Sequence, residues 1–108
     1  MKKIALLIAT AFMAAGAQAA YKDGVYDAEG KGNHGPIKVQ VTVKDGKVAD
    51  VKVVNHTDTG MIIQAPIDYM LPEIVKANGT KGVESIAGAT NSSKGIKEAV
   101  DKALAKAQ

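Results

Sequence analysis

Residues 84–93, Glu-Ser-Ile-Ala-Gly-Ala-Thr-Asn-Ser-Ser, have the side-chain types and spacing best suited to chemistry in this sequence. Small and hydroxyl residues stand directly before a segment with the apolar spacing of a helix. A helix N-terminus offers unpaired backbone N–H groups and a partial positive charge, and Gly88 lets a ligand approach the backbone closely. This arrangement suits a phosphate group. The alternative is a plain helix start, capped by Ser92 or Ser93, with nothing bound.

Other residues that could do chemistry are few. The glycine spacing and the Gly-Lys-Ser/Thr sequence of a nucleotide-binding P-loop are missing. No carboxylate spacing supports a metal site around His34 and His56, and each histidine is better explained as a loop or surface residue. The chain has no cysteine, which excludes disulfides, thiolate-bound metals, iron–sulfur clusters and thioether-linked haem. We therefore expect no metal and no catalytic acid–base pair.

The first 19 residues predict a secretory signal peptide. A short basic start is followed by an apolar run over residues 4–15 and a small-x-small pattern that ends at Ala19. Cleavage there leaves residues 20–108 in the periplasm or outside the cell. It removes two lysines and no acid, so the net charge falls from +3 to +1, and the electrostatic argument for a nucleic-acid partner is lost.

The mature part predicts a three-stranded antiparallel arrangement. Residues 21–32 have the character of a short, glycine-rich strand. Residues 37–44 alternate apolar and polar side chains, Asp45-Gly46 is typical of a two-residue hairpin turn, and residues 47–56 return as the partner strand. We expect the inner face of that partner to consist of Ala49, Val51 and Val53.

Two helical segments follow. Residues 57–64 are expected to be a loop, with Pro66 in the first turn of a helix and Pro72 producing a kink or two short helices. Residues 82–86 suggest a short strand. The last helix starts near residues 91–93 and runs toward Ala107. The predicted fold is α+β, a small antiparallel sheet with two helices packed on one face, as a single domain over residues 20–108.

Residues 84–93 also resemble the flavinylation motif of the FMN-binding domain family. That motif is an acidic residue, two variable positions, Ser or Thr, Gly, Ala, and then Thr or Ser. The family's domain occurs in a peripheral subunit of sodium-pumping quinone reductases, in Rnf-type complexes and in exported fumarate-reductase-like flavoproteins. Residues 21–26, 35–39, 45–47 and 56–59 also resemble family segments, so the resemblance covers essentially the whole mature chain.

The resemblance implies FMN joined by a phosphoester to Thr90, the position that matches the last residue of the motif. A flavin transferase makes this bond, and Glu84 matches the acidic residue of its recognition pattern. The motif departs from the family at Glu84, where Asp is usual, and at Ala87, where Ser or Thr is usual. By the same resemblance we expect Gly88, Ala89, Asn91, Ser92 and Ser93 to surround the phosphate.

Residues 60–63 depart from the family's usual Pro-Gly-x-Gly, and Met61 and Ile62 are either contacts of the flavin ring or simply loop and core. Tyr26 and Tyr69 are expected in the core rather than stacked on the ring. The function implied is an exported electron-transfer flavoprotein, not a stand-alone enzyme. The expected redox partners are cytochromes or a separate reductase chain, within a membrane-associated complex or outside one. The alternatives are a small flavin-bearing subunit of a periplasmic reductase and a noncatalytic binding module without flavin.

Overall fold

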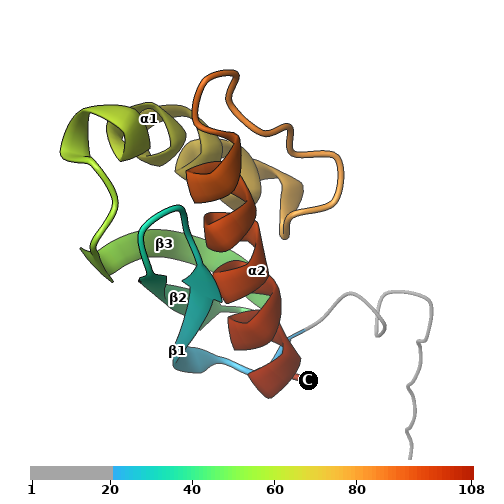
Figure 1. Ribbon diagram of the computed structural model, residues 1–108. Helices are drawn as coiled ribbons and strands as arrows, with labels where there is room; N and C mark the ends of the chain where they lie inside the picture. The colour runs from blue at the N-terminus through green and yellow to red at the C-terminus, as the bar shows by residue number, and fades with distance from the viewer. Residues whose placement is uncertain (1–20) are drawn as a thin grey trace, which may run out of the picture.

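The computed structural model describes residues 21–108, so the predicted signal peptide lies outside the described residues. Three antiparallel strands are followed by two helices: β1 (Gly24–Lys31), β2 (Pro36–Lys44), β3 (Lys47–His56), α1 (Gly60–Ala77) and α2 (Thr90–Lys106). The sheet order is β1-β2-β3. Both helices lie on one side of the sheet, with α2 against β1 and β2 and α1 against β3 (Figure 1). The predicted α+β fold is confirmed.

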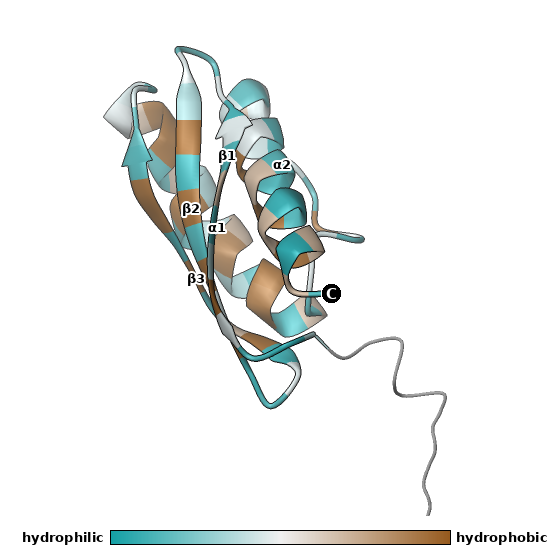
Figure 2. Ribbon diagram, turned by 90° about the horizontal axis from the view of Figure 1, so that it is seen from below, coloured by the Kyte–Doolittle hydropathy of each residue, from teal (hydrophilic) through white to brown (hydrophobic). Residues whose placement is uncertain are grey.

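The central strand β2 supplies the middle of the core. Its apolar residues alternate with polar ones, as the bands along the strand in Figure 2 show. Ile37, Val39 and Val41 are fully buried beneath the helices, whereas Lys38, Gln40 and Thr42 are only partly covered. The alternation therefore sets which face of the sheet receives the helices.

The predicted hairpin between β2 and β3 is confirmed. Asp45 and Gly46 both have positive φ angles, 57° and 78°, as a two-residue turn of the primed type requires. The predicted inner face of β3 is partly wrong, because a β-bulge follows the turn: Thr42 pairs with Asp50 and Val43 with Val48. Ala49 is the extra residue and is exposed, and Val48 takes the inward position.

The predictions for α1 need three corrections. The helix begins at Gly60, so residues 60–64 are helix rather than loop, because the buried side chain of Ile63 extends the apolar stripe back by one turn. Pro66 lies in the second turn and is itself buried. Pro66 and Pro72 both stand inside one continuous helix, so the alternative of two short helices is wrong. Packing of the stripe against β3 outweighs the backbone bonds that the two prolines remove.

The segment between the helices, residues 78–89, contains no strand, so the strand predicted at residues 82–86 is wrong. Asn78 ends α1 in the left-handed conformation, and Gly79 N–H donates to the Ile74 carbonyl at 3.0 Å. This is the glycine-containing helix end that the sequence predicted. Val83 is buried, but its N–H donates to Thr80 in a turn instead of a sheet ladder.

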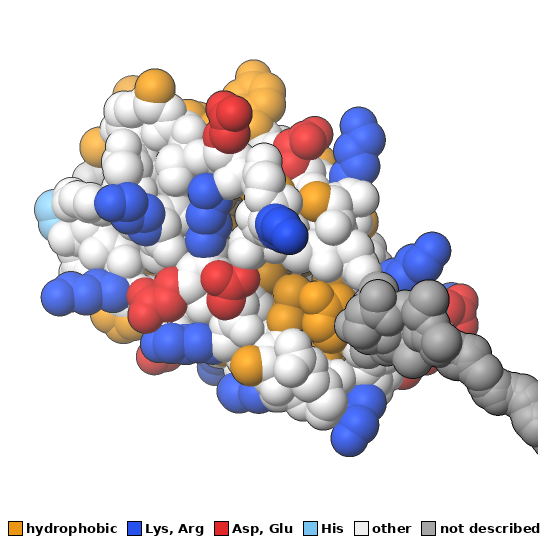
Figure 3. Space-filling model, turned by 90° about the vertical axis from the view of Figure 1, so that its right-hand side faces the viewer, with side chains coloured by type: hydrophobic (Ala, Val, Ile, Leu, Met, Phe, Trp, Pro, Cys, Tyr) orange, Lys and Arg blue, Asp and Glu red, His pale blue; other side chains and the backbone are white. Residues whose placement is uncertain are grey.

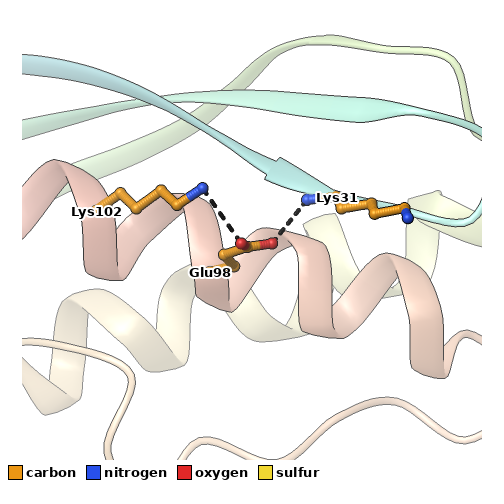
Figure 4. A network of polar contacts seen from close by, with 3 residues as sticks. All are labelled: Lys31, Glu98 and Lys102. Atoms are coloured by element: carbon orange, nitrogen blue, oxygen red, sulfur yellow. Dashed lines mark hydrogen bonds and ion pairs between the residues drawn. The ribbon is translucent and has the colours of Figure 1, made fainter.

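The last helix follows its prediction closely along the inner stripe. Ile96, Ala99, Val100, Ala103, Leu104 and Ala107 are all buried. On the outer side, Glu98 accepts a hydrogen bond from Lys31 N–H at 2.8 Å and forms an ion pair with Lys102 at 3.2 Å (Figure 4). The backbone contact from Lys31 and then the contact with Lys102 lower the pKa of Glu98. The Lys31 bond joins the end of β1 to the exposed side of the helix.

Glycines let α2 lie unusually close to β1. A Cβ added at Gly30 would overlap the Gly95 carbonyl oxygen and come within 2.8 Å of Ala99 N. A Cβ added at Gly95 would come within 2.8 Å of the Lys31 carbonyl oxygen. Helix backbone and strand backbone are therefore in direct contact, which fixes the position of the α2 N-terminus relative to the turn after β1.

We predict that Gly30→Ala destabilises the protein by about 1–3 kcal/mol, because the backbone atoms opposite cannot move aside as a flexible side chain would. Gly60→Ala is the matched control, since a Cβ there has nothing within 4 Å; it should leave stability unchanged or raise it by less than about 1 kcal/mol. Urea unfolding followed by far-UV circular dichroism measures both. Equal stabilities for the two variants would contradict the close contact.

Candidate functional site

The hydroxyl-rich motif forms the start of α2. Thr90 is the first helical residue, with Ala89 as the N-cap, and the first helical hydrogen bond runs from Ser93 N–H to the Ala89 carbonyl at 2.9 Å. The N–H groups of Thr90, Asn91 and Ser92 precede that bond, so the helix itself gives them no acceptor. Their partial positive charge gathers at this end of α2.

The two serines do not cap the helix, so that prediction is wrong: no side chain caps the N-terminus of α2. Ser92 and Ser93 are buried, because they continue the inner stripe of Ile96 and Ala99 by one more turn. Ser93 Oγ accepts from Ile86 N–H at 3.0 Å and donates to the Ala89 carbonyl at 2.7 Å. It ties the preceding loop to the helix instead of facing a ligand.

Ser92 donates its hydroxyl proton to Asp58, which stands between β3 and α1 and is only 6% exposed. Asp58 also accepts from the backbone N–H groups of Asn33, at 3.0 Å, and His34, at 2.7 Å. Sequence reasoning missed Asp58 and Asn33. Nothing in the sequence indicated that Asp58, a single acid between two threonines, would be buried. The inward position of Ser92 could have been predicted, because Ser92 stands one helical turn before the apolar residue Ile96.

A cavity of about 290 Å³ opens at the start of α2. Its lining brings together distant parts of the chain: Asn33 from the turn after β1, Ile62 from the first turn of α1, and the motif residues Gly88, Ala89, Thr90, Asn91 and Ser92. Thr90 and Asn91 are exposed. Gly88 has φ 85°, and a Cβ there would meet nothing within 4 Å, so glycine is needed for the backbone conformation and not for space.

The remaining predicted site residues lie elsewhere. Met61 is 91% exposed and is not part of the cavity lining, although its neighbour Ile62 is. Glu84 is exposed and borders a second hollow of about 360 Å³ together with Tyr69 and Glu73. Tyr69 is 68% exposed, so its predicted core position is wrong. Tyr26 does pack against the core, as predicted, and donates its hydroxyl to the Lys22 carbonyl at 2.6 Å.

One face of the molecule is mixed in charge. Figure 3 shows lysine and acidic side chains interspersed on the face at the right-hand side of Figure 1, so this face carries no patch of a single charge sign. Within residues 21–108, no helix is long and apolar enough to cross a bilayer, and no group of three or more His, Cys, Asp or Glu side chains could hold a metal ion.

Comparison with known proteins decides the family. The family model described as FMN-binding domain matches residues 32–105. The chain belongs to the FMN-binding domain family. The match begins at the turn that carries Asn33 and ends near the end of α2, so it includes every element that lines the cavity.

Two relatives place the domain in longer proteins. A protein of Treponema pallidum (strain Nichols), described only as uncharacterized, is 34% identical over 87 residues, which cover 81% of this chain and 24% of that protein. NADH:acrylate oxidoreductase of Vibrio harveyi is 30% identical over 84 residues, which cover 78% of this chain and 8% of that protein. The chain thus spans about a quarter or less of the length of these relatives.

The cavity of this FMN-binding domain fits the phosphate end of FMN. Helix N–H groups without helical acceptors and the exposed residue Thr90 lie at the cavity, and the positive φ of Gly88 shapes the backbone beside them. A volume of about 290 Å³ is at the low end of small-molecule pockets, which typically enclose roughly 300–1,000 Å³. FMN would be only partly enclosed here.

We predict that Asp58 makes stability depend on acid pH. Burial alone raises the pKa of its carboxyl, but the hydrogen bonds from Ser92, His34 N–H and Asn33 N–H, with the charge of His34, outweigh burial and hold the pKa below its ordinary value of 3.8. A lowered pKa in the folded state means that this stabilisation is complete above the ordinary value and is lost as the pH falls through the folded one.

Urea unfolding across the acid range should therefore show wild-type stability falling below pH 3.8, with part of the fall absent in Asp58→Asn. Asp68→Asn is the control, because Asp68 is an exposed α1 carboxylate that contacts Gln64. It should retain the wild-type acid dependence. An Asp58→Asn curve parallel to that of wild type would contradict the assignment.

Proposed function

We propose that this FMN-binding domain carries FMN covalently, as a phosphoester of Thr90 Oγ1, and transfers electrons between redox partners at the cell envelope. The observation that carries the proposal is the position of Thr90. It is an exposed hydroxyl residue on the first turn of α2, borders the cavity, and follows Ala89 at the point where backbone N–H groups lack helical acceptors.

The attachment is a phosphoryl transfer catalysed by a separate flavin transferase. The donor is a flavin phosphoanhydride, in which the phosphorus bonded to the ribityl oxygen also carries a phosphate leaving group. A bond forms between Thr90 Oγ1 and that phosphorus, the anhydride P–O bond breaks, and the hydroxyl proton leaves through the transferase to the released phosphate. Nothing is oxidised or reduced, and the products are FMN joined to Thr90 and the released phosphate. Compared with free FMN and the free chain, the joined product lacks the mass of one water.

The chain's own residues hold the resulting phosphodiester. Its remaining negative charge lies where the N-terminus of α2 is partially positive, within reach of the Thr90 and Asn91 N–H groups. The Ser92 hydroxyl donates to Asp58, so backbone N–H groups, and not the serine side chains, are the donors to the phosphate. Ile62 adds an apolar side chain to the lining of the cavity.

FMN supplies the redox chemistry when it is attached, and the protein supplies position and electrostatics. A small domain with a partly open cavity buries little of such a ligand, so noncovalent affinity alone is modest. A covalent anchor keeps the cofactor after export, which residues 1–19 favour. Partial exposure of the ring suits electron exchange with a partner such as a cytochrome or a reductase chain.

A second candidate is that the domain serves as the small flavin-bearing subunit of an envelope reductase. The similarity to a segment of NADH:acrylate oxidoreductase favours it, because that segment belongs to a much longer enzyme. In either case the domain itself relays electrons. Co-purification with a reductase chain supports the subunit role, and reduction by small carriers without such a chain supports the free carrier.

We predict that Thr90→Ala abolishes flavin attachment and leaves the fold intact, because Thr90 is exposed and its side chain caps nothing. Thr90→Ser should retain attachment, since the hydroxyl remains. Intact mass of protein co-produced with a flavin transferase measures this: the wild type should gain the mass of FMN less one water. Ser85→Ala removes another hydroxyl from the same motif and should stay modified. Flavin found on Thr90→Ala would refute the assignment.

We also predict a separate role for Glu84 in recognition by the transferase. It is exposed and lies outside the cavity lining, so Glu84→Ala should leave the melting temperature unchanged and yet lower the extent of attachment severalfold at limiting transferase. Glu73→Ala is the matched control, because Glu73 borders the same hollow as Glu84 but lies on α1, outside the motif. Equal attachment in both variants would remove the recognition role.

A further inference from the structure

Asp58 joins three segments that are far apart in the sequence. Its Oδ2 atom accepts from Asn33 N–H and from the Ser92 hydroxyl, and its Oδ1 atom accepts from His34 N–H. It stands two residues before α1, which contributes Ile62 to the cavity. Asn33 and Ser92 also line that cavity. One carboxylate therefore bonds to two of the segments that line the cavity and stands in the connection that leads into the third.

We propose that Asp58 is a positioning residue of the flavin site, which holds the turn after β1 against the first turn of α2 so that Thr90 meets the flavin donor in one fixed geometry. This role rests on the proposed attachment at Thr90. Asp58 does not line the cavity, so it acts through Asn33 and Ser92 and not by contact with the phosphate.

The contacts around Asp58 restrict how the turn after β1 can move relative to the first turn of α2. A Cβ at Gly32 would come within 2.6 Å of Asp58 Oδ2 and within 2.9 Å of Oδ1, so the turn backbone lies directly on the carboxylate. The Asn91 amide donates to Asn33 Oδ1 at 2.8 Å beside it. Of the two residues that follow Thr90, Asn91 is therefore bonded to this turn directly and Ser92 is bonded to it through Asp58.

The charge of Asp58 is accommodated by the same contacts. A buried carboxylate is costly unless it is hydrogen-bonded, and three donors satisfy this one. Asp58 accepts the Ser92 hydroxyl and the turn N–H groups, whereas the N–H groups of Thr90 and Asn91 have no helical acceptor and can donate to a second anion. The carboxylate faces inward and the phosphate site outward at the same helix end.

Asp58→Asn tests this role with little change in volume. An amide has one oxygen, so its NH₂ group must face either Asn33 N–H or His34 N–H, and one turn donor loses its acceptor. With purified transferase and flavin donor, kcat for attachment to Thr90 should fall roughly tenfold, as expected for loss of a charged hydrogen bond. KM for the protein should stay within about twofold, because the docking surface is unchanged. The visible circular dichroism of the attached flavin should also change.

Glu98→Gln is the matched control. Glu98 also accepts a backbone N–H at the end of β1, from Lys31 at 2.8 Å, but it lies two turns along α2 on the exposed side and should attach flavin at the wild-type rate. Ser92→Ala removes one of the three contacts and keeps the test usable if Asp58→Asn unfolds. Its kcat should fall less than that of Asp58→Asn, and the double variant should fall by less than the product of the two single effects.

Wild-type kcat and an unchanged dichroism spectrum in folded Asp58→Asn or Ser92→Ala would overturn the positioning role while the proposed function stands. A wild-type chain that takes no flavin from an active transferase would instead overturn the proposed function, and the role of Asp58 with it. A fall in kcat as large in Glu98→Gln as in Asp58→Asn would make the effect one of general stability and would also overturn the proposal.

Discussion

The hydrogen bonds of the buried Asp58 carboxylate are the constraint on which the site depends. Without them, the turn after β1 and the first turn of α2 would be neighbours joined on the exposed side by the Asn33–Asn91 amide pair. With them, the backbone at Asn33 and His34 and the side chain of Ser92 converge on one group. Asn33 and Ser92, which both donate to this carboxylate, are among the residues that line the cavity.

A second constraint sets how closely the helix approaches the sheet. Gly30 and Gly95 bring backbone against backbone between β1 and α2. The helix start is therefore placed from two directions, by contact along β1 and by Asp58 at its end. Such double support suits a site whose own residues are small and make few contacts.

Much of this fold could be predicted from local patterns. The alternation along β2, the Asp45-Gly46 turn, the stripe from Ile96 to Ala107 and the end of α1 at Asn78 each follow from one short stretch of sequence, and all four are present. The errors arose where long-range packing decides. The bulge at Ala49, the inclusion of both prolines in α1, and the inward turn of Ser92 depend on partners elsewhere in the chain.

The candidate site divides in the same way. The motif residues from Gly88 to Asn91 could be found because their types are unusual before a helix, and the structure gathers them around one cavity. Asn33 and Asp58 could not be found from the sequence, because turn residues and isolated acids are common. Only the folded chain brings these two residues to the motif. Met61 was a candidate contact of the flavin ring, and yet it is 91% exposed and lies outside the cavity lining.

The central claim is that a flavin phosphate is bonded to Thr90 at the start of α2. Phosphorus-31 NMR of the folded, flavin-bearing protein tests it most directly. A phosphoester to both Thr90 and the ribityl chain has no proton to lose near neutrality, so its single resonance should not shift between about pH 5 and 8. A noncovalently bound FMN is a monoester that titrates near pH 6, as phosphomonoesters typically do. A resonance that moves through that range, or flavin that separates from the chain on unfolding, would contradict the account.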